Sequence, residues 1–297
     1  MTDSAFFIVL VLEGVLAGAV YALIALAFVV VYKASRMINF ALGEWVLLAS
    51  RLAASGFHAL GLGLIGALGF AAAGMAAVGV LFSRVVLRRM LGQPLISLIM
   101  VSIGLGILVR GASPLVFRGI PGGMPVRVPE LALSIQGVPI STEKLLAAAV
   151  AAIAILALTW FFHGSRTGLA LRAIASDQRA AMTVGISMQR HLSIAWALAG
   201  ALAVLAGVLW TAVSGGGFGI EVMGLKVFPI VIIGGLDSIA GTIIAAILIG
   251  VLESLAIGYL DPVVGSGFSH VVAYVLLLAT VFVRPYGLFG RPDVVRV

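Results

Sequence analysis

The sequence predicts an all-α, polytopic integral membrane protein with about eight to ten transmembrane helices. Hydrophobic residues fill 62% of the 297 positions and charged residues only 10%, whereas a soluble domain carries about 25% charged residues. The mean hydropathy of +1.25 and the 37 glycines agree, because small residues let membrane helices approach closely. No basic region precedes the first apolar run, so we expect a retained span rather than a cleaved signal peptide.

Nine apolar segments approach the roughly 20 residues that a membrane helix needs, although several are short or interrupted by glycine. We expect no separate soluble domain, because no long linker divides the chain, and residues 1–297 are predicted to form one membrane domain. The expected spans are Phe6–Tyr32, Trp45–Phe57, Gly63–Phe82, Leu95–Val109, Leu145–Phe162, Leu192–Val213, Ile220–Ile233, Ala240–Leu260 and His270–Val283.

Arginine groups predict the orientation of these spans. With nine spans, the arginines of 84–89, 163–191 and 284–296 fall on one side, and residues 113–143, with five of the ten prolines, fall on the other. By the positive-inside rule the arginines are cytoplasmic, so the N-terminus lies outside and the C-terminus inside. The net charge of +7 then reflects cytoplasmic arginines at a lipid bilayer rather than nucleic-acid binding. The external loop 113–143 is either a docking platform or a plain connector.

A polar, basic, helix-prone island lies between two long apolar segments at residues 163–191. This island contains four arginines and one aspartate. In so apolar a protein, a charged helix of this kind is most simply a handle for a soluble partner. Because the chain has no energy-coupling motif of its own, we expect that partner to be an ATPase. The residues expected at this contact are Arg172, Asp177, Arg179, Ala180, Gly185 and Ile186.

Signatures of catalysis are missing from the sequence. None of the three lysines follows a glycine, which excludes a Gly-Lys-Ser/Thr phosphate loop. The chain has no cysteine and no His-Glu-x-x-His, and its four histidines are scattered singly. The Gly61–Gly66 match to GxGxxG opens an apolar span, so close helix packing explains it better than a dinucleotide site. We therefore expect no enzyme activity and no catalytic, cofactor or metal site in this chain.

Ionisable and polar residues inside or beside spans are candidates for a translocation pathway, because burying them is costly. Glu13 either lines the path or lies wet near the outer end of the first helix. Asn39 and Glu44 suit the cap and first turn of a new helix, although a break in the backbone there could also contact solute. Arg51 either snorkels back to the cytoplasmic edge or pairs with a carboxylate.

A glycine-rich break separates two short apolar runs at residues 234–241. A turn on the cytoplasmic side is the favoured interpretation, and a hinge or gate is the functional one. The residues that would form this hinge are Gly234, Gly235, Asp237 and Gly241.

Ordered blocks of this sequence resemble the permeases of branched-chain amino acid ABC importers of the LivH type. The resemblance is carried by Tyr21–Leu26, Val31–Tyr32, Ile38–Glu44, the central arginine island with Gly185–Ile186, Leu225–Phe228, Gly234–Gly241 and Gly287–Val297. It implies the ABC importer permease fold, in a bacterial inner membrane, with a second related permease, two ATPases that use the ATP, and a periplasmic binding protein. It also implies that Arg172–Ile186 is the coupling helix.

The chain departs from the family pattern at Leu42, where His or Gln is usual, at Asp237 for Gly, and at Ala240 for Pro. The implied solute is leucine, isoleucine or valine, with urea, short amides or aromatic acids as alternatives. An ion-coupled secondary transporter or channel, with Glu13, Glu44 or Glu253 as its coupling carboxylate, is a rival. A membrane scaffold without transport is a third possibility.

Overall fold

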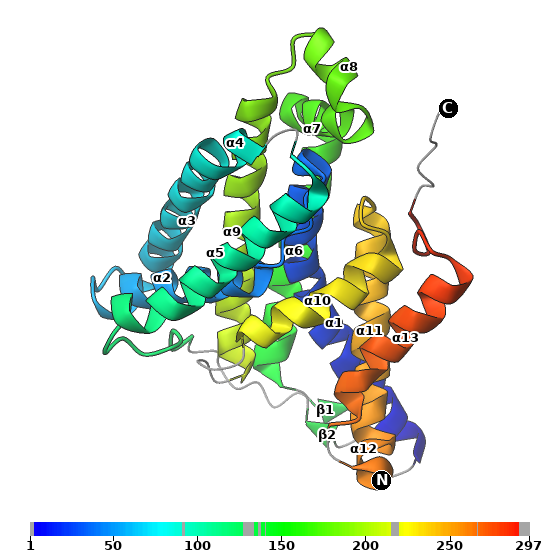
Figure 1. Ribbon diagram of the computed structural model, residues 1–297. Coiled ribbons are helices and arrows are strands. Elements are labelled where there is room, and N and C mark those ends of the chain that lie inside the picture. The colour runs from blue at the N-terminus through cyan, green and yellow to red at the C-terminus, as the bar shows by residue number, and fades with distance from the viewer. Residues whose placement is uncertain are drawn as a thin grey trace.

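The computed structural model describes residues 3–90, 93–126, 134–135, 138–139, 141–214, 220–265 and 267–290. They form a helical bundle with one short hairpin (Figure 1). The elements in chain order are α1 (Asp3–Ser35), α2 (Leu42–His58), α3 (Gly63–Phe82), the π-helical turn η1 (Ser83–Leu87), α4 (Arg88–Met90), α5 (Leu95–Val116), β1 (Ser134–Ile135), β2 (Val138–Pro139), α6 (Thr142–Gly164), α7 (Arg166–Ser176), α8 (Gln178–Thr183), α9 (Met188–Ser214), α10 (Ile220–Gly234), α11 (Ile239–Tyr259), α12 (Asp261–Val264) and α13 (Ser269–Val283).

The polytopic helical fold expected from the composition is confirmed. Six helices among the described residues are long and apolar enough to cross a membrane, and two shorter apolar helices accompany them. Each of the nine expected spans corresponds to a helix. Eight of them are these six long and two short helices, and the ninth is α2. The six long segments are Ser4–Ser35, Gly63–Met90, Leu95–Val116, Thr142–Gly164, Met188–Ser214 and Ile239–Tyr259, and the short ones are Met223–Gly234 and Ser269–Val283.

The connection between α5 and α6 differs from its prediction in two details. The segment expected to be a loop from residue 113 is still helical to Val116, because α5 continues through Pro114 in its last turn. The same connection carries the hairpin β1–β2, whose register pairs Ser134 with Pro139; no strand was expected. Residues 127–133, 136–137 and 140 of the connection lie outside the described residues.

The arginines of residues 84–89 and 163–191 lie on elements at one end of the bundle. Figure 1 places α4, α7 and α8 there, whereas α12, the hairpin and the start of α1 lie at the opposite end. Which end faces the cytoplasm stays a prediction from the positive-inside rule.

Helix α1 forms the core of the bundle and packs most extensively against α11 and α9. Glycines allow the α1–α11 contact: a Cβ atom on Gly14 would lie 2.5 Å from the Cα of Val251, and one on Gly250 would lie 2.4 Å from the carbonyl oxygen of Gly14. The GxxxG spacing of Gly14 and Gly18 therefore brings two backbones together.

Between α1 and α2 the backbone is irregular but buried, with Asn39 only 1% exposed. Its side-chain Oδ1 accepts a hydrogen bond from the Ala41 amide at 3.0 Å, and the Phe40 amide donates to Ser102 Oγ of α5 at 3.2 Å. Such a break is tolerated at membrane depth because protein groups satisfy its amides. Helix α10 crosses α2 at this break, where a Cβ atom on Gly224 would lie 2.5 Å from the amide nitrogen of Gly43.

Candidate functional site

Helices α7 and α8 form a compact projection beyond the membrane helices (Figure 1). Ser165 begins it, since its hydroxyl accepts a hydrogen bond from the Gly168 amide at 2.8 Å and so caps α7. A small apolar cluster of Ile174, Ala181 and Met188 holds the two helices together. The polar island of the sequence is thus a folded unit with its own core.

Two of the expected coupling residues define the limits of α8. Asp177 Oδ1 accepts a hydrogen bond from the Ala180 amide at 3.0 Å, which caps the helix start. Gly185 has a φ of +84°, and the Ile186 amide donates to the Ala181 carbonyl at 3.1 Å. This bonding closes the helix with a left-handed glycine, the Schellman arrangement. Asp177, Gly185 and Ile186 therefore shape the projection, and their contact with a partner stays a prediction.

The outer surface of α8 and of the turn that follows presents apolar side chains. Val184 is 76% exposed and Met182 is 52% exposed, and Ala180 is exposed beside them. The side chain of Arg179, another expected coupling residue, lies outside the described residues. Exposed apolar residues on a water-facing projection are a feature of surfaces that bind another protein.

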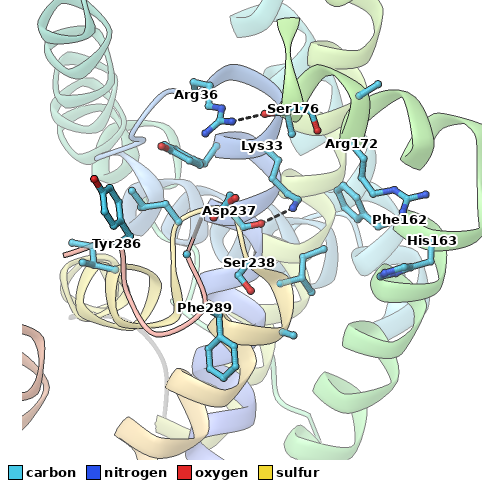
Figure 2. Close-up of a pocket in the computed structure, with 18 of the residues that line it drawn as sticks. Lys33, Arg36, Phe162, His163, Arg172, Ser176, Asp237, Ser238, Tyr286 and Phe289 are labelled. Atoms are coloured by element: carbon cyan, nitrogen blue, oxygen red, sulfur yellow. Dashed lines mark hydrogen bonds between the residues drawn. The ribbon is translucent and has the colours of Figure 1, made fainter. Parts of the chain in front are cut away.

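A cleft of about 1020 Å³ separates this projection from the glycine-rich break (Figure 2). Four segments line it: the end of α1, the α6–α7 junction, the α10–α11 turn and residues 285–290. Lys33 Nζ donates to the Asp237 carbonyl oxygen at 2.5 Å, and Arg36 donates to the Ala175 carbonyl oxygen. The end of α1 therefore bridges the predicted coupling segment and the predicted hinge.

The cleft is cationic and holds one of the expected coupling residues, Arg172. Its side chain is half-buried, and its Nε atom is buried with no hydrogen-bond partner among the described residues. Figure 2 shows Arg172 beside His163 on one side of the cleft and Asp237 and Ser238 on the other. The sequence did not indicate that these segments meet.

The glycine-rich break is a tight turn between α10 and α11. Gly235 has a φ of +98°, and Ser238 caps α11 by accepting from the Gly241 amide at 3.0 Å. A Cβ atom on Gly241 would lie 2.0 Å from the Gly234 carbonyl oxygen, so the two helix ends are in backbone contact. The Leu288 amide donates to Ile233 at 2.7 Å and ties the segment after α13 to this turn. Motion of the turn as a hinge stays a prediction.

The four expected pathway residues make separate side-chain contacts. Glu13 forms an ion pair with Lys144 of α6, and Glu44 forms one with Arg110 of α5. Asn39 Nδ2 is buried with no hydrogen-bond partner among the described residues. Their role in transport stays a prediction.

Whether Arg51 snorkels toward the cytoplasmic edge stays a prediction. Its guanidinium donates to the Ile120 carbonyl oxygen at 3.4 Å, in the segment after α5. The side chain points there because α2 starts deep in the bundle and ends at His58, whose Nε2 lies 3.0 Å from the Gly123 carbonyl oxygen. No ion pair of Arg51 is found among the described residues.

A buried network joins α1, α10, α11 and α13, and sequence reasoning did not find it as a group. Glu253 accepts hydrogen bonds from Lys226 and, at 2.9 Å, from the hydroxyl of Tyr21. His270 Nδ1 lies 3.0 Å from both the Glu253 carboxylate and the Lys226 ammonium. Glu253 was singled out as a coupling carboxylate, but its partners come from positions too distant for spacing to indicate.

Comparison with known proteins matches residues 10–281 to the family model described as branched-chain amino acid transport system / permease component. The chain is 31% identical over 300 residues to the high-affinity branched-chain amino acid transport system permease protein BraD of Pseudomonas aeruginosa, which covers 96% of each chain. It is 31% identical over 318 residues to the corresponding LivH of Salmonella typhimurium, covering 98% of each. The guanosine ABC transporter permease protein NupP of Bacillus subtilis is 30% identical over 142 residues, 45% of this chain and 39% of that protein. The chain therefore belongs to the branched-chain amino acid transport system permease family, and it is a multi-pass membrane protein.

Proposed function

We propose that this chain forms half of the transmembrane pathway of an ATP-driven importer, with α7 and α8 as the docking site of an ATPase subunit. The observation that carries the proposal is the projection itself: a capped helix with its own apolar cluster and exposed apolar side chains next to a cationic cleft. A membrane protein that needed no cytoplasmic partner would have no reason to expose Met182 and Val184 to water.

The transport mechanism that this arrangement supports is alternating access. ATP binding would draw two docked ATPases together, and α7 would pass the displacement across the cleft to the end of α1 and the α10–α11 turn, which are already joined through Lys33 and Arg36. ATP hydrolysis would reset them. The chain itself supplies no covalent chemistry and no cofactor, and the ATP is used by the partner subunits.

The proposed assembly lies in the bacterial inner membrane with the N-terminus outside and the C-terminus in the cytoplasm. It contains a second, related permease, so that the pair is a heterodimer, two ATPases, and a periplasmic solute-binding protein. The arginines at the α7–α8 end support this orientation.

The proposed solute is leucine, isoleucine or valine, on the basis of the near full-length relatives. The partial relative described as a guanosine permease shows why the solute is proposed and not assigned. Urea, short amides and aromatic acids are the alternatives.

A matched pair of substitutions tests the docking site. Val184→Glu places a charge on the α8 surface, and Val263→Glu places the same charge at an equally exposed valine of α12, at the other end of the bundle; the two are 76% and 83% exposed. We expect Val184→Glu to reduce co-purification of the ATPase with the permease and to abolish ATP-driven uptake, whereas Val263→Glu leaves co-purification intact. Retention of the ATPase by Val184→Glu would refute the docking site. Concentration of solute by this chain alone under a proton or sodium gradient would refute the ABC mechanism.

A further inference from the structure

Charges on the face of α10

Helix α10 lies between two groups of charged side chains. On one side it crosses α2 at Gly224, and α2 contacts α5; on the other it contacts α11 and α13. In the view of Figure 1, α5, α10 and α13 all lie in front of α1, so they belong to one face of the molecule. Each side of this face carries one ion pair within the apolar helices.

The first pair is Glu44 of α2 with Arg110 of α5. The Glu44 side chain is 10% exposed and that of Arg110 is 58% exposed. Gly106 makes room for the carboxylate, since a Cβ atom there would lie 3.2 Å from Glu44 Oε2. Glu44 accepts a hydrogen bond from one guanidinium nitrogen of Arg110, Nη2, and a guanidinium has five N–H donors in all. More than half of the Arg110 side chain remains exposed beside this contact.

The second group is the network of Glu253, Lys226 and His270. The first two side chains are buried, whereas that of His270 is 64% exposed. The Nδ1 atom of His270 faces the buried pair, and its Nε2 atom has no hydrogen-bond partner among the described residues. Like Arg110, His270 is an exposed ionisable side chain that contacts buried partners.

A lipid-facing surface looks different. On α6 the most exposed positions are Ile153, Leu156 and Trp160, which suit hydrocarbon and the interface. Ionisable side chains within spans are expensive in hydrocarbon and nearly always face protein or a water-filled cavity. Two such side chains are exposed here, Arg110 on α5 and His270 on α13, and Leu225 is exposed on α10. These exposed ionisable residues set this face apart.

We propose that the face made by α5, α10 and α13 lines a water-filled solute path, in which Arg110 and His270 are the polar contacts for a solute that carries a carboxylate. A guanidinium held by Glu44 and still presenting N–H donors is suited to a carboxylate, as is a histidine N–H. This assignment rests on the proposed import function. It deepens that function, because it favours an amino acid over a nucleoside or urea, neither of which has a carboxylate.

The absence of cysteine from the chain permits a direct test with single cysteines. Leu225→Cys reports on the proposed path, and Leu156→Cys is the matched control on α6; the two leucines are 56% and 69% exposed. The assembled importer, with cysteine-free partner subunits, is placed in lipid nanodiscs and treated with a charged methanethiosulfonate, which reacts with hydrated thiolate. We expect Leu225→Cys to react about tenfold faster than Leu156→Cys, with or without bound ATP. Equal or slower reaction in both nucleotide states would overturn the proposal.

Uptake kinetics test the carboxylate contact. Arg110→Gln is expected to raise severalfold the half-saturating concentration of the imported solute, while the ATPase still co-purifies, and Arg110→Lys is expected to restore part of the affinity. An unchanged half-saturating concentration in Arg110→Gln would overturn the role of Arg110. If Leu225→Cys stays unreactive while uptake remains dependent on ATP, the path assignment fails and the import function stands. Loss of ATP dependence in the wild-type importer would instead defeat the import function.

Discussion

Removal of one partner from the buried Lys226–Glu253 pair should strongly destabilise the protein. The two side chains are 10% and 7% exposed, so Lys226→Met leaves the Glu253 carboxylate inside the bundle with only Tyr21 and His270 as hydrogen-bonding neighbours. An uncompensated buried charge of this kind costs about 3–5 kcal/mol. At 3 kcal/mol the folding equilibrium would shift by about two powers of ten.

The double variant Lys226→Met/Glu253→Leu removes both charges and should recover most of this loss, because two apolar groups of similar volume replace the pair. The control is Lys144→Met, which breaks the Glu13 pair, whose side chains are 39% and 21% exposed; its effect should stay below about 1 kcal/mol. The assay is reversible unfolding of the detergent-solubilised protein in mixed micelles. If Lys226→Met and Lys144→Met cost the same, or if the double variant is no more stable than the single one, the reasoning fails.

Three further predictions concern the backbone and one carboxylate. Gly250→Val should lower the midpoint of thermal unfolding by the equivalent of about 1–3 kcal/mol, because its Cβ atom would meet the Gly14 carbonyl oxygen at 2.4 Å, whereas Gly69→Val, with nothing within 4 Å, should not. Gly185→Ala should cost about 1 kcal/mol because of its left-handed φ of +84°, and should weaken ATPase co-purification; unchanged co-purification would separate the shape of α8 from docking. The Ser269 backbone amide holds the pKa of the Asp261 carboxyl below its ordinary value, so the stability that it adds is complete above that ordinary value and is lost as the pH falls through the lowered pKa. Unfolding midpoints measured against pH should show this acid loss in the wild type and not in Asp261→Asn.

Much of the fold could be predicted because apolar runs record membrane spans directly. Each expected span became a helix, and the close helix approach expected from the abundance of glycine is found at Gly14. The boundaries were less certain, since Pro114 lies in the last turn of α5 rather than after its end. The contact of Arg51 with Ile120 could not be predicted, because spacing alone does not reveal that α2 starts deep inside the bundle.

The candidate site could be predicted only in pieces. The charge of residues 163–191 indicated a projection, whereas the helix start at Asp177 and the helix end at Gly185 were found only in the structure. The cleft required four segments from distant parts of the chain to meet. The hydrogen bond from Tyr21 to Glu253 spans 232 positions, and no periodicity or local propensity encodes a contact over that distance.

Helix α10 has a consequence for how force crosses the membrane. Its fifteen residues extend about 22 Å at 1.5 Å per residue, and it is clamped without intervening side chains at Gly224 against Gly43 and at Gly234 against Gly241. A helix held by two such backbone contacts tilts as a rigid body more readily than it bends. A small tilt imposed beside the cleft would displace the opposite end of α10, at Ile220, by rotation about the Gly224 crossing.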